Sequence, residues 1–368
     1  MKTAYFPTEL SSIYARLDNI KPKEYCRNRN FIDGDVTLLS PYISRGVLST
    51  KLVLQSLIER GFDLSKIEKF VQELAWRDYW QHTWKEKGEL INLDIKHQQT
   101  HVENFKISHA LINSNTGINA IDEALKKFNQ TGYLHNHVRM YVASLACNVA
   151  KSYWLLPAKW MYYHLLDADW ASNVLSWQWV AGSNSHKKYF ANQENINKYC
   201  YTDQIGTYLD VDYDQLPTLN IPDQLSELML LDLNTNLPET NLKQINPDLP
   251  TLIYNFYNLD PNWYADTKAN RILLLEPSVF EKYPISDNSI KFMLDLAKNI
   301  PDIKIFSGSF DELEKSHQLN HVRYKEHPLN TDYKGEMEQR DWMFNISGSF
   351  PSFFKYWKQC KKQLEVGR

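Results

Sequence analysis

The sequence has few cysteines, little net charge and no long apolar run. Its four cysteines lie far apart and form no C-x-x-C pair, which excludes a disulfide framework or an iron–sulfur site and favours a reducing compartment. The net charge of −3 gives no overall attraction to nucleic acid, so phosphate contacts require a local basic patch. No segment approaches the length of a membrane span, and the first residues lack the apolar run of a signal peptide. We therefore expect a cytoplasmic protein without a membrane segment.

Aromatic residues are abundant instead, with 11 Trp, 22 Tyr and 16 Phe in 368 residues. The segment 167–179 reads DADWASNVLSWQW and places three tryptophans beside two aspartates and an asparagine. A core would favour Leu and Val there, and a solvated surface would favour Lys and Glu. Such a segment suits either a thick helical core or a cavity for a planar ligand with polar edges.

Helical signals dominate the first half of the chain. Ser65 and Glu68 predict a capping box at the start of a helix that Gly88 ends. A helix is expected over 118–129, and another over the run LHNHVRMYVASLACNVAKSY. Pro157 suits the first turn of one more helix. The first half is therefore predicted to be a helical domain.

The pattern changes after residue 210. Residues 211–248 are rich in Asn, Leu, Pro and Asp and indicate a linker. Three apolar runs beyond it predict buried strands, 251–257, 271–276 and 303–307. A helical segment between the last two indicates a parallel α/β layer, without a Gly-rich phosphate loop. We expect a mostly α-helical domain over 1–210 and an α/β, Rossmann-like domain over 249–368.

Polar side chains share faces of the predicted helices with tryptophans. Glu73 is grouped with Trp76 and Arg77 on one helix, and Asn136 lies one turn from Arg139 on another. Because a buried charge must be paired, one interpretation is a set of internal salt bridges. The other is a polar cavity lined with rings, which suits a flavin or a nucleobase. The residues alone leave both open.

Several separated motifs resemble the flavin-binding helical domain of the DNA photolyase and cryptochrome family. In chain order they are GDVTLLSPYISRGVLS, VQELAWRDYW, TGYLHNHVRMYVAS and HLLDADWASNVLSWQWVAGSNS. The resemblance spans about residues 25–190 and implies a helical fold that binds FAD. It assigns cofactor contacts to Thr37, Leu38, Leu39, Ser40, Arg139, Asp167, Asp169 and Asn173. The first four would hold the phosphates.

Around the flavin ring the resemblance implies more specific roles. Arg139 and Asp167 match an ion pair beside the ring, where a fixed positive charge favours the reduced, anionic flavin. Asp169 matches a residue at the polar edge, and Asn173 matches the side chain that faces the reactive ring nitrogen. Leu38 departs from the family pattern, which usually has an arginine there, so one phosphate contact is missing.

The substrate side resembles the branch that repairs cyclobutane pyrimidine dimers. The matching positions for dimer contacts are Glu73, Trp76, Asn136, Met140 and Trp179. The two indoles would stack on the flipped-out bases, at about 1–3 kcal/mol per base. Glu73 and Asn136 would bind the base edges, and protonated Glu73 would stabilise the dimer radical anion. The branch for the other ultraviolet photoproduct has histidines at the positions of Asn136 and Met140, while His135 and His137 here are given a structural role.

Trp177 and Trp154 match the first two members of the family's electron relay, which photoreduces the flavin. Leu111 occupies the third position and cannot be oxidised. The relay must therefore end at Trp154 or divert through another ring, such as Trp160 or a nearby tyrosine. Repair itself uses flavin that is already reduced and needs no relay.

The C-terminal third resembles the family's antenna domain, which normally precedes the helical domain. The segments RILLLEPSVFEKYPISDNSIKFMLDLAKNIPDIKIFSGSFDEL and ISGSFPSFFKYWKQC carry this likeness. We infer a swapped domain order, with a possible second antenna chromophore of unknown identity. The alternative is a layer that only covers the helical domain.

Contacts to DNA phosphates are expected from Arg77, Lys187 and Lys188, with a solvated charged loop as the alternative for the two lysines. His97 and His101 have helical metal-ligand spacing but lack a further ligand nearby, so no metal site is predicted.

The sequence thus predicts a deoxyribodipyrimidine photolyase, a lyase that repairs cyclobutane dimers in DNA by electron transfer from excited reduced FAD. The alternative is a cryptochrome-like blue-light photoreceptor that uses the same flavin. A third possibility is a nucleic-acid binder that has lost its cofactor. The sequence makes no prediction of protein partners.

Overall fold

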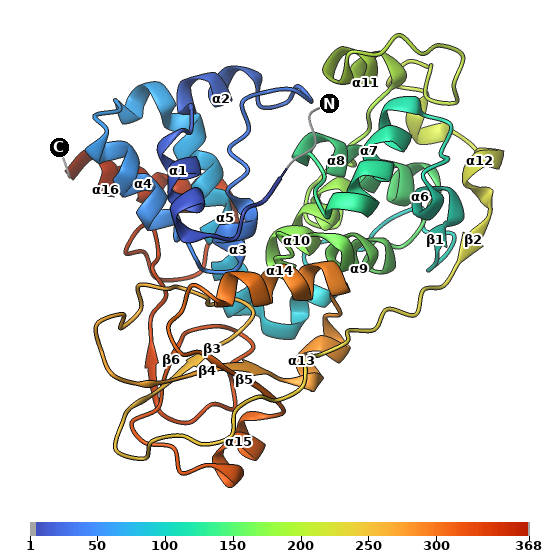
Figure 1. Cartoon of the computed structure of the whole chain (residues 1–368). Coiled ribbons are helices and arrows are strands. Elements are labelled where there is room, and N and C mark those ends of the chain that lie inside the picture. Colours follow the sequence, from blue (N-terminus) through green and yellow to red (C-terminus); the bar gives the residue numbers. More distant parts are fainter. Residues whose placement is uncertain (1–4, 367–368) are drawn as a thin grey trace. The chain divides into compact units, whose positions relative to one another are not determined.

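The computed structural model describes residues 5–366 and contains two compact units that interleave along the chain (Figure 1). The first unit comprises Glu24–Val36 and Lys87–Leu233, together with Tyr5. The second comprises Phe6–Lys23, Thr37–Glu86 and the residues from 234 onward. The predicted domains 1–210 and 249–368 are contiguous segments, whereas these units are not. Within the described residues, no helix is both long and apolar enough to span a membrane.

The first unit is almost entirely helical. Its elements are η2 (Gly88–Asn92), β1 (Ile107–Ser108), α6 (His109–Asn113), α7 (Asn119–Thr131), α8 (Asn136–Ser144), the π-helix η3 (Leu145–Val149), α9 (Leu155–His164), α10 (Trp170–Ala181), α11 (Gln193–Cys200), η4 (Leu216–Thr218), α12 (Asp223–Ser226) and β2 (Leu228–Met229). Helix α2 (Pro22–Asn28) begins in the second unit's segment of the chain and ends in that of the first.

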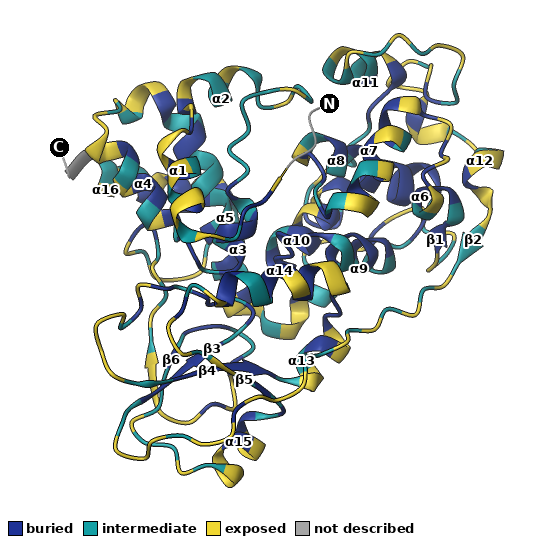
Figure 2. Cartoon of the chain, in the orientation of Figure 1, coloured by how far each residue is buried: buried dark blue, intermediate teal, exposed yellow. Residues whose placement is uncertain are grey.

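Helix α10 forms the centre of the first unit. It packs on α8, α9 and η2, and it is buried along most of its length (Figure 2). Such burial explains the apolar and aromatic composition of the helix on all sides. The strands β1 and β2 form a short antiparallel ribbon that holds the segment after α12 against α6.

The second unit combines helices with a sheet. Its elements are α1 (Leu10–Asp18), α3 (Ser40–Ser44), α4 (Thr50–Glu59), η1 (Leu64–Ile67), α5 (Glu68–Lys87), β3 (Thr251–Tyr254), β4 (Asn270–Leu275), α13 (Pro277–Lys282), α14 (Asp287–Ala297), β5 (Lys304–Ser307), α15 (Phe310–Ser316), β6 (Arg323–Lys325), β7 (Glu336–Glu338) and α16 (Phe353–Val366).

The five strands form one parallel sheet in the order β5-β4-β3-β6-β7. Helices α14 and α15 lie on opposite sides of it (Figure 1). On one face, Ile253, Ile272 and Leu274 join Phe310 and Leu313 of α15 in a buried cluster. Because both faces are covered, β3 and β4 are apolar without alternation. The parallel strand–helix–strand alternation predicted from the sequence is confirmed.

Two local predictions need correction. The capping box at Ser65 is wrong, because Asp63 accepts hydrogen bonds from the backbone N–H and the hydroxyl of Ser65 and caps a 3-10 turn before α5. An aspartate carboxylate accepts such bonds at least as well as a hydroxyl, so the earlier residue takes the role. The predicted strand 251–257 ends at Tyr254, where a bridge between Asn255 and Asn258 turns the chain.

Candidate functional site

Arg139 and Asp167 form a buried ion pair in the first unit. Arg139 Nη2 donates to both carboxylate oxygens of Asp167 at 3.0 Å, and its Nε donates to the carbonyl of Leu134 at 2.8 Å. The Asp167 side chain is 4% exposed, so its charge depends on the guanidinium. The predicted ion pair is therefore present, on α8 and on the turn that precedes α10.

The start of α10 carries the other two predicted ring contacts. Asp169 caps the helix, since its carboxylate accepts a hydrogen bond from the Ser172 N–H at 2.8 Å. Asn173 is buried on the first turn, and its Nδ2 donates to the carbonyl of Ala158 at 2.8 Å. This bond leaves the Asn173 side-chain oxygen as the group able to accept from a ligand.

The residues predicted for the dimer on α8 are accessible. Asn136 is the first residue of the helix and is exposed, and Met140 lies one turn further along. His135 caps this helix, because its Nδ1 accepts from the His137 N–H at 3.2 Å. Burial, assisted by the nearby His137 and Arg139, lowers the pKa of His135 to about 4. These contacts are those expected of a histidine with a structural role.

The predicted relay residues are buried, and Trp179 is not. Trp154 is 0% exposed and Trp177 2%, whereas Trp179 on the same helix as Trp177 is 40% exposed. An indole that stacks on a base must be accessible, and an indole that only passes an electron need not be. The roles of the three tryptophans stay predictions.

In the second unit, the predicted phosphate cradle is a tight turn. Leu38 adopts a left-handed backbone with φ 55, which is unfavourable for a residue with a side chain by about 1–2 kcal/mol. Thr37 Oγ1 accepts from the Leu39 N–H at 3.3 Å, and Arg16 Nη1 donates to the Leu38 carbonyl at 3.3 Å. Ser40 begins α3. The turn is therefore held by its own side chains and by α1.

Helix α5 presents Glu73, Trp76 and Arg77 on one half-buried face. Lys69 Nζ forms an ion pair with Glu73 at 2.9 Å and also donates to Gln72 at 3.0 Å. Arg77 Nη1 donates to the hydroxyl of Ser44 at 2.9 Å, which ties α5 to α3. Glu73 thus already binds a cation on its own helix.

Trp76 has a stacking partner that the sequence does not reveal. The Phe353 ring of α16 lies 3.6 Å from its centroid at an interplanar angle of 10°, and Phe353 is 2% exposed. One face of the indole is therefore covered by the C-terminal helix. A nucleobase that stacks on Trp76 has to use the other face.

Replacing Phe353 by Ala is expected to lower the free energy of unfolding by about 3–5 kcal/mol, as for other buried aromatic rings. Urea unfolding followed by tryptophan fluorescence measures this change. Phe354→Ala is the matched control, because that ring is 69% exposed, and it should change stability by less than about 0.5 kcal/mol. Equal effects of the two substitutions would contradict the stacked arrangement.

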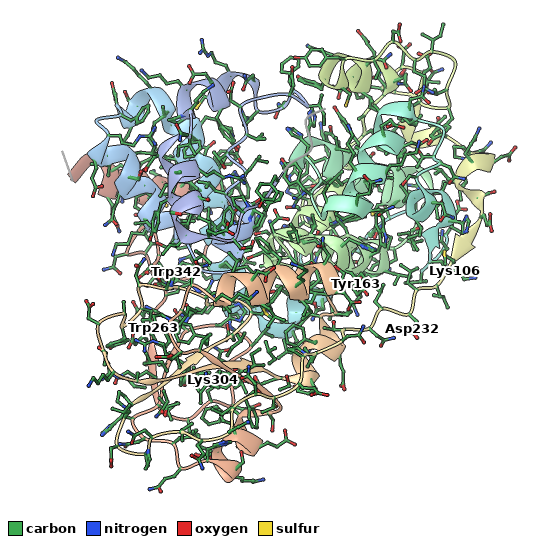
Figure 3. All side chains as sticks on the ribbon, viewed as in Figure 1. Lys106, Tyr163, Asp232, Trp263, Lys304 and Trp342 are labelled. Carbon is green, nitrogen blue, oxygen red and sulfur yellow. The ribbon has the colours of Figure 1, made fainter. Side chains whose placement is uncertain are left out.

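Asp78 is a buried carboxyl on the same helix. It accepts hydrogen bonds from the Thr50 hydroxyl at 2.8 Å and the Met343 N–H at 2.9 Å. Burial is the main cause that raises its pKa to about 6. One turn later, His82 stacks on Trp342, labelled in Figure 3, with ring centroids 3.8 Å apart. These contacts join α5, the helix that carries Glu73, Trp76 and Arg77, to the segment after β7.

Residues 70–219 match the family model described as the FAD binding domain of DNA photolyase. Over this part, which is less than half of the chain, the chain is similar to DNA photolyases. The matched range contains Glu73, Asn136, Arg139, Asp167 and Asn173.

Curated relatives carry the same family name. A deoxyribodipyrimidine photo-lyase of Alkalihalophilus pseudofirmus is 28% identical over 212 residues, which cover 54% of this chain and 42% of the relative. One of Agrobacterium fabrum is 32% identical over 169 residues, which cover 44% of this chain and 35% of the relative. The chain therefore matches less than half the length of either photolyase. A solved cryptochrome of Synechocystis sp. PCC6803 has 22% identity and a TM-score of 0.48, covering 54% of this chain and 44% of that one.

The segment that matches the FAD-binding model of photolyases includes the loop that holds Lys187 and Lys188. Lys187 is exposed, and Lys188 Nζ donates to the carbonyl of Thr100 at 2.7 Å. Burial lowers the pKa of Lys188. Lys187 is the more exposed of the two lysines, so it is better placed than Lys188 to reach a phosphate.

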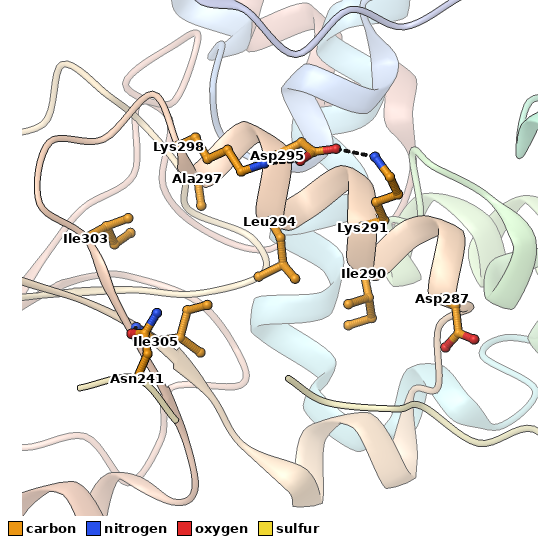
Figure 4. Close-up of a pocket in the computed structure, with 10 residues that line it drawn as sticks. All are labelled: Asn241, Asp287, Ile290, Lys291, Leu294, Asp295, Ala297, Lys298, Ile303 and Ile305. Atoms are coloured by element: carbon orange, nitrogen blue, oxygen red, sulfur yellow. Dashed lines mark hydrogen bonds and ion pairs between the residues drawn. The ribbon is translucent and has the colours of Figure 1, made fainter. Parts of the chain in front are cut away.

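A pocket of about 470 Å³ lies in the second unit, between α14 and β5 (Figure 4). Asp295 at its rim accepts from Lys291 and Lys298, each at 2.6 Å. Its apolar wall is formed by Ile290, Leu294, Ile303 and Ile305. None of the residues predicted to contact flavin or DNA lines this pocket.

Proposed function

We propose that this chain is a flavin-dependent photolyase that repairs cyclobutane pyrimidine dimers in DNA. The observation that carries the proposal is the bidentate Arg139–Asp167 pair next to the Asp169-capped start of α10, inside the segment that matches the photolyase FAD-binding model. A half-buried guanidinium, a carboxylate at a helix start and a side-chain amide oxygen one turn later form a set of polar groups that fits the polar edge of a flavin.

The following residues would hold FAD. Arg139 and Asp167 would lie beside the ring, Asp169 at its polar edge, and the Asn173 side-chain oxygen near its reactive nitrogen. Thr37 and Ser40 would contribute hydroxyls to the phosphates, with the backbone of Leu38 and Leu39. Bound and reduced, FAD supplies the excited electron that splits the dimer.

The chain's own groups would bind and orient the damaged bases. Trp179 would stack on a flipped pyrimidine, with Met140 as an apolar contact, and Trp76 would stack on a base through the face that Phe353 does not cover. Asn136 would donate its amide N–H groups to a base carbonyl. Once its ion pair with Lys69 is broken, protonated Glu73 would donate a hydrogen bond to the dimer as negative charge develops on the dimer. Arg77 would approach a phosphate.

Irradiation of a dimer-containing oligonucleotide with the reduced, flavin-loaded protein under blue light tests the proposal. Native protein is expected to remove dimers. Glu73→Ala is expected to slow repair by about 100-fold, as for the loss of one preorganised donor, without changing flavin content. Chromatography of the oligonucleotide measures the dimers that remain.

Gln72→Ala is the matched control, since Gln72 shares Lys69 with Glu73 but is given no role in repair. It should repair at the native rate. Absence of repair by native protein with reduced flavin bound would exclude the photolyase reading and leave a photoreceptor. Equal rates for the two variants would remove Glu73 from the reaction.

We extend the proposal to the sheet of the second unit, as an antenna-like layer that follows the flavin-binding residues in the chain. Its parallel strands support this assignment. An absorption spectrum of purified protein tests for a second chromophore, which would add a band beyond those of flavin. A spectrum of flavin alone would favour a covering role for the layer.

A further inference from the structure

Trp154 is the last tryptophan of the predicted relay, and Leu111, in the third position, is fully buried in α6. An aliphatic side chain cannot supply the missing electron. An oxidisable ring with access to solvent is needed near Trp154 if the relay is to keep charge separated.

Tyr153 provides such a ring. Its centroid lies 5.6 Å from that of Trp154, at an interplanar angle of 44°. Trp154 is completely buried, whereas Tyr153 is half-buried and its ring centroid lies 5.3 Å from that of the exposed Phe105. The contact between the two rings therefore leads from the interior to the surface of the first unit.

Asp94 connects the polar atoms of the two rings. Trp154 Nε1 donates to Asp94 Oδ1 at 2.8 Å. The phenol of Tyr153 is hydrogen-bonded to the same carboxylate, and burial followed by the Asp94 charge and this bond raises the pKa of Tyr153 to about 12. A carboxylate that is hydrogen-bonded to a phenol is a suitable proton acceptor when the phenol loses an electron.

The surrounding backbone keeps this arrangement fixed. Asp94 Oδ2 accepts from the Gln99 N–H at 2.9 Å, and the Gln99 side chain binds the backbone of both Ser152 and Trp154. The Tyr153 N–H donates to the carbonyl of Asn104 at 2.8 Å. Asp94, Tyr153 and Trp154 are thus joined by one network rather than by chance proximity of side chains.

We propose that Tyr153 is the terminal electron donor of the relay and that Asp94 accepts its proton, an inference that rests on the function proposed above. With oxidised flavin bound, light would move one electron from Trp177 toward it and Trp154 would refill Trp177; this photoreduction would supply the reduced flavin that repair uses. Tyr153 then reduces the Trp154 radical cation by one electron. Its O–H bond breaks, the proton moves to the Asp94 carboxylate, and a neutral tyrosyl radical remains at the half-buried position.

Trp160 is the other ring considered from the sequence. It is 2% exposed, and it packs edge-on against Phe128 and His164, at 5.8 and 6.1 Å. Phenylalanine is much harder to oxidise than tyrosine, and neither contact is coupled to a carboxylate of the Trp154 network. The geometry therefore favours Tyr153.

Flash illumination of protein loaded with oxidised flavin, followed by time-resolved absorption, tests the proposal. Native protein should show a tryptophan radical that converts to a tyrosyl radical. Tyr153→Phe should lose the tyrosyl radical and shorten the life of the tryptophan radical. Tyr163→Phe is the matched control, a half-buried tyrosine on α9 that contacts His164, and it should behave like native protein.

A second measurement needs no flavin. In Asp94→Asn the indole N–H of Trp154 should shift in the proton–nitrogen NMR spectrum, and the pKa of Tyr153 should fall, because the charge that raises it is removed. An unchanged indole signal and an unchanged phenol titration would overturn the role of Asp94.

The outcomes separate the two proposals. Absence of any tryptophan radical in native protein overturns photoreduction through Trp177 and Trp154, and the terminal role of Tyr153 with it. A tryptophan radical in native protein with a tyrosyl signal that persists in Tyr153→Phe overturns only the inference about Tyr153. Trp177→Phe should abolish both radicals and spare repair by chemically reduced protein.

Discussion

Replacing Arg139 by Met is expected to lower the free energy of unfolding by about 3–5 kcal/mol, because it removes the guanidinium that pairs with the buried Asp167 carboxylate. The Asp167 side chain is 4% exposed, and the guanidinium reaches both of its oxygens at 3.0 Å. The substitution also removes the hydrogen bond to the Leu134 carbonyl. Urea unfolding of the full chain measures the loss. Under the proposed function, flavin content of the purified protein falls as well.

Two further variants distinguish the loss of the ion pair from a general loss of stability. Arg139→Met combined with Asp167→Asn should recover part of the stability, since no unpaired charge then stays buried. Arg27→Met is the matched control, because Arg27 pairs with Glu24 at 3.1 Å with 74% of its side chain exposed. Its expected cost is at most about 1 kcal/mol. Similar losses for the two arginines would contradict the buried pair.

The parts of the fold predicted from sequence are those with strong local patterns. Apolar runs identified β4 and β5, and Gly88 and Gly132 lie at the ends of α5 and α7 with positive φ, where glycine is favoured. The short strands β6 and β7 were missed. They read Arg-Tyr-Lys and Glu-Met-Glu, and such charged strands near a sheet edge carry no apolar run.

At the candidate site, contacts between residues far apart in the chain could not be predicted from local patterns. The Arg139–Asp167 pair followed from the family resemblance, and the structure contains it. The stack of Phe353 on Trp76 joins residues far apart in the chain, which no helical or strand period can pair. Asp94 was missed because it lies in a loop 60 positions before Trp154, and no local pattern in the sequence pairs the two residues.

Lowering the pH from 7 to 5 is expected to destabilise the first unit through His164 by about 2 kcal/mol. Burial lowers the pKa of this histidine to about 4, from an ordinary value of 6.5. His164 therefore becomes protonated below about pH 6.5 in the unfolded chain, but only below about pH 4 in the folded chain. Stability is complete above pH 6.5 and is lost as the pH falls through this window, by about 1.4 kcal/mol for each pH unit.

His164→Phe isolates this contribution, because the ring packs edge-on against Phe128, Trp160 and Tyr163 and a phenyl ring can replace it. The stability of the variant relative to native protein should increase by about 2 kcal/mol between pH 7 and pH 5. Native and His164→Phe curves that run parallel would show that the histidine takes up its proton in the folded state. The aromatic surroundings of His164 would then not exclude water, since only a ring kept from water resists protonation in this range.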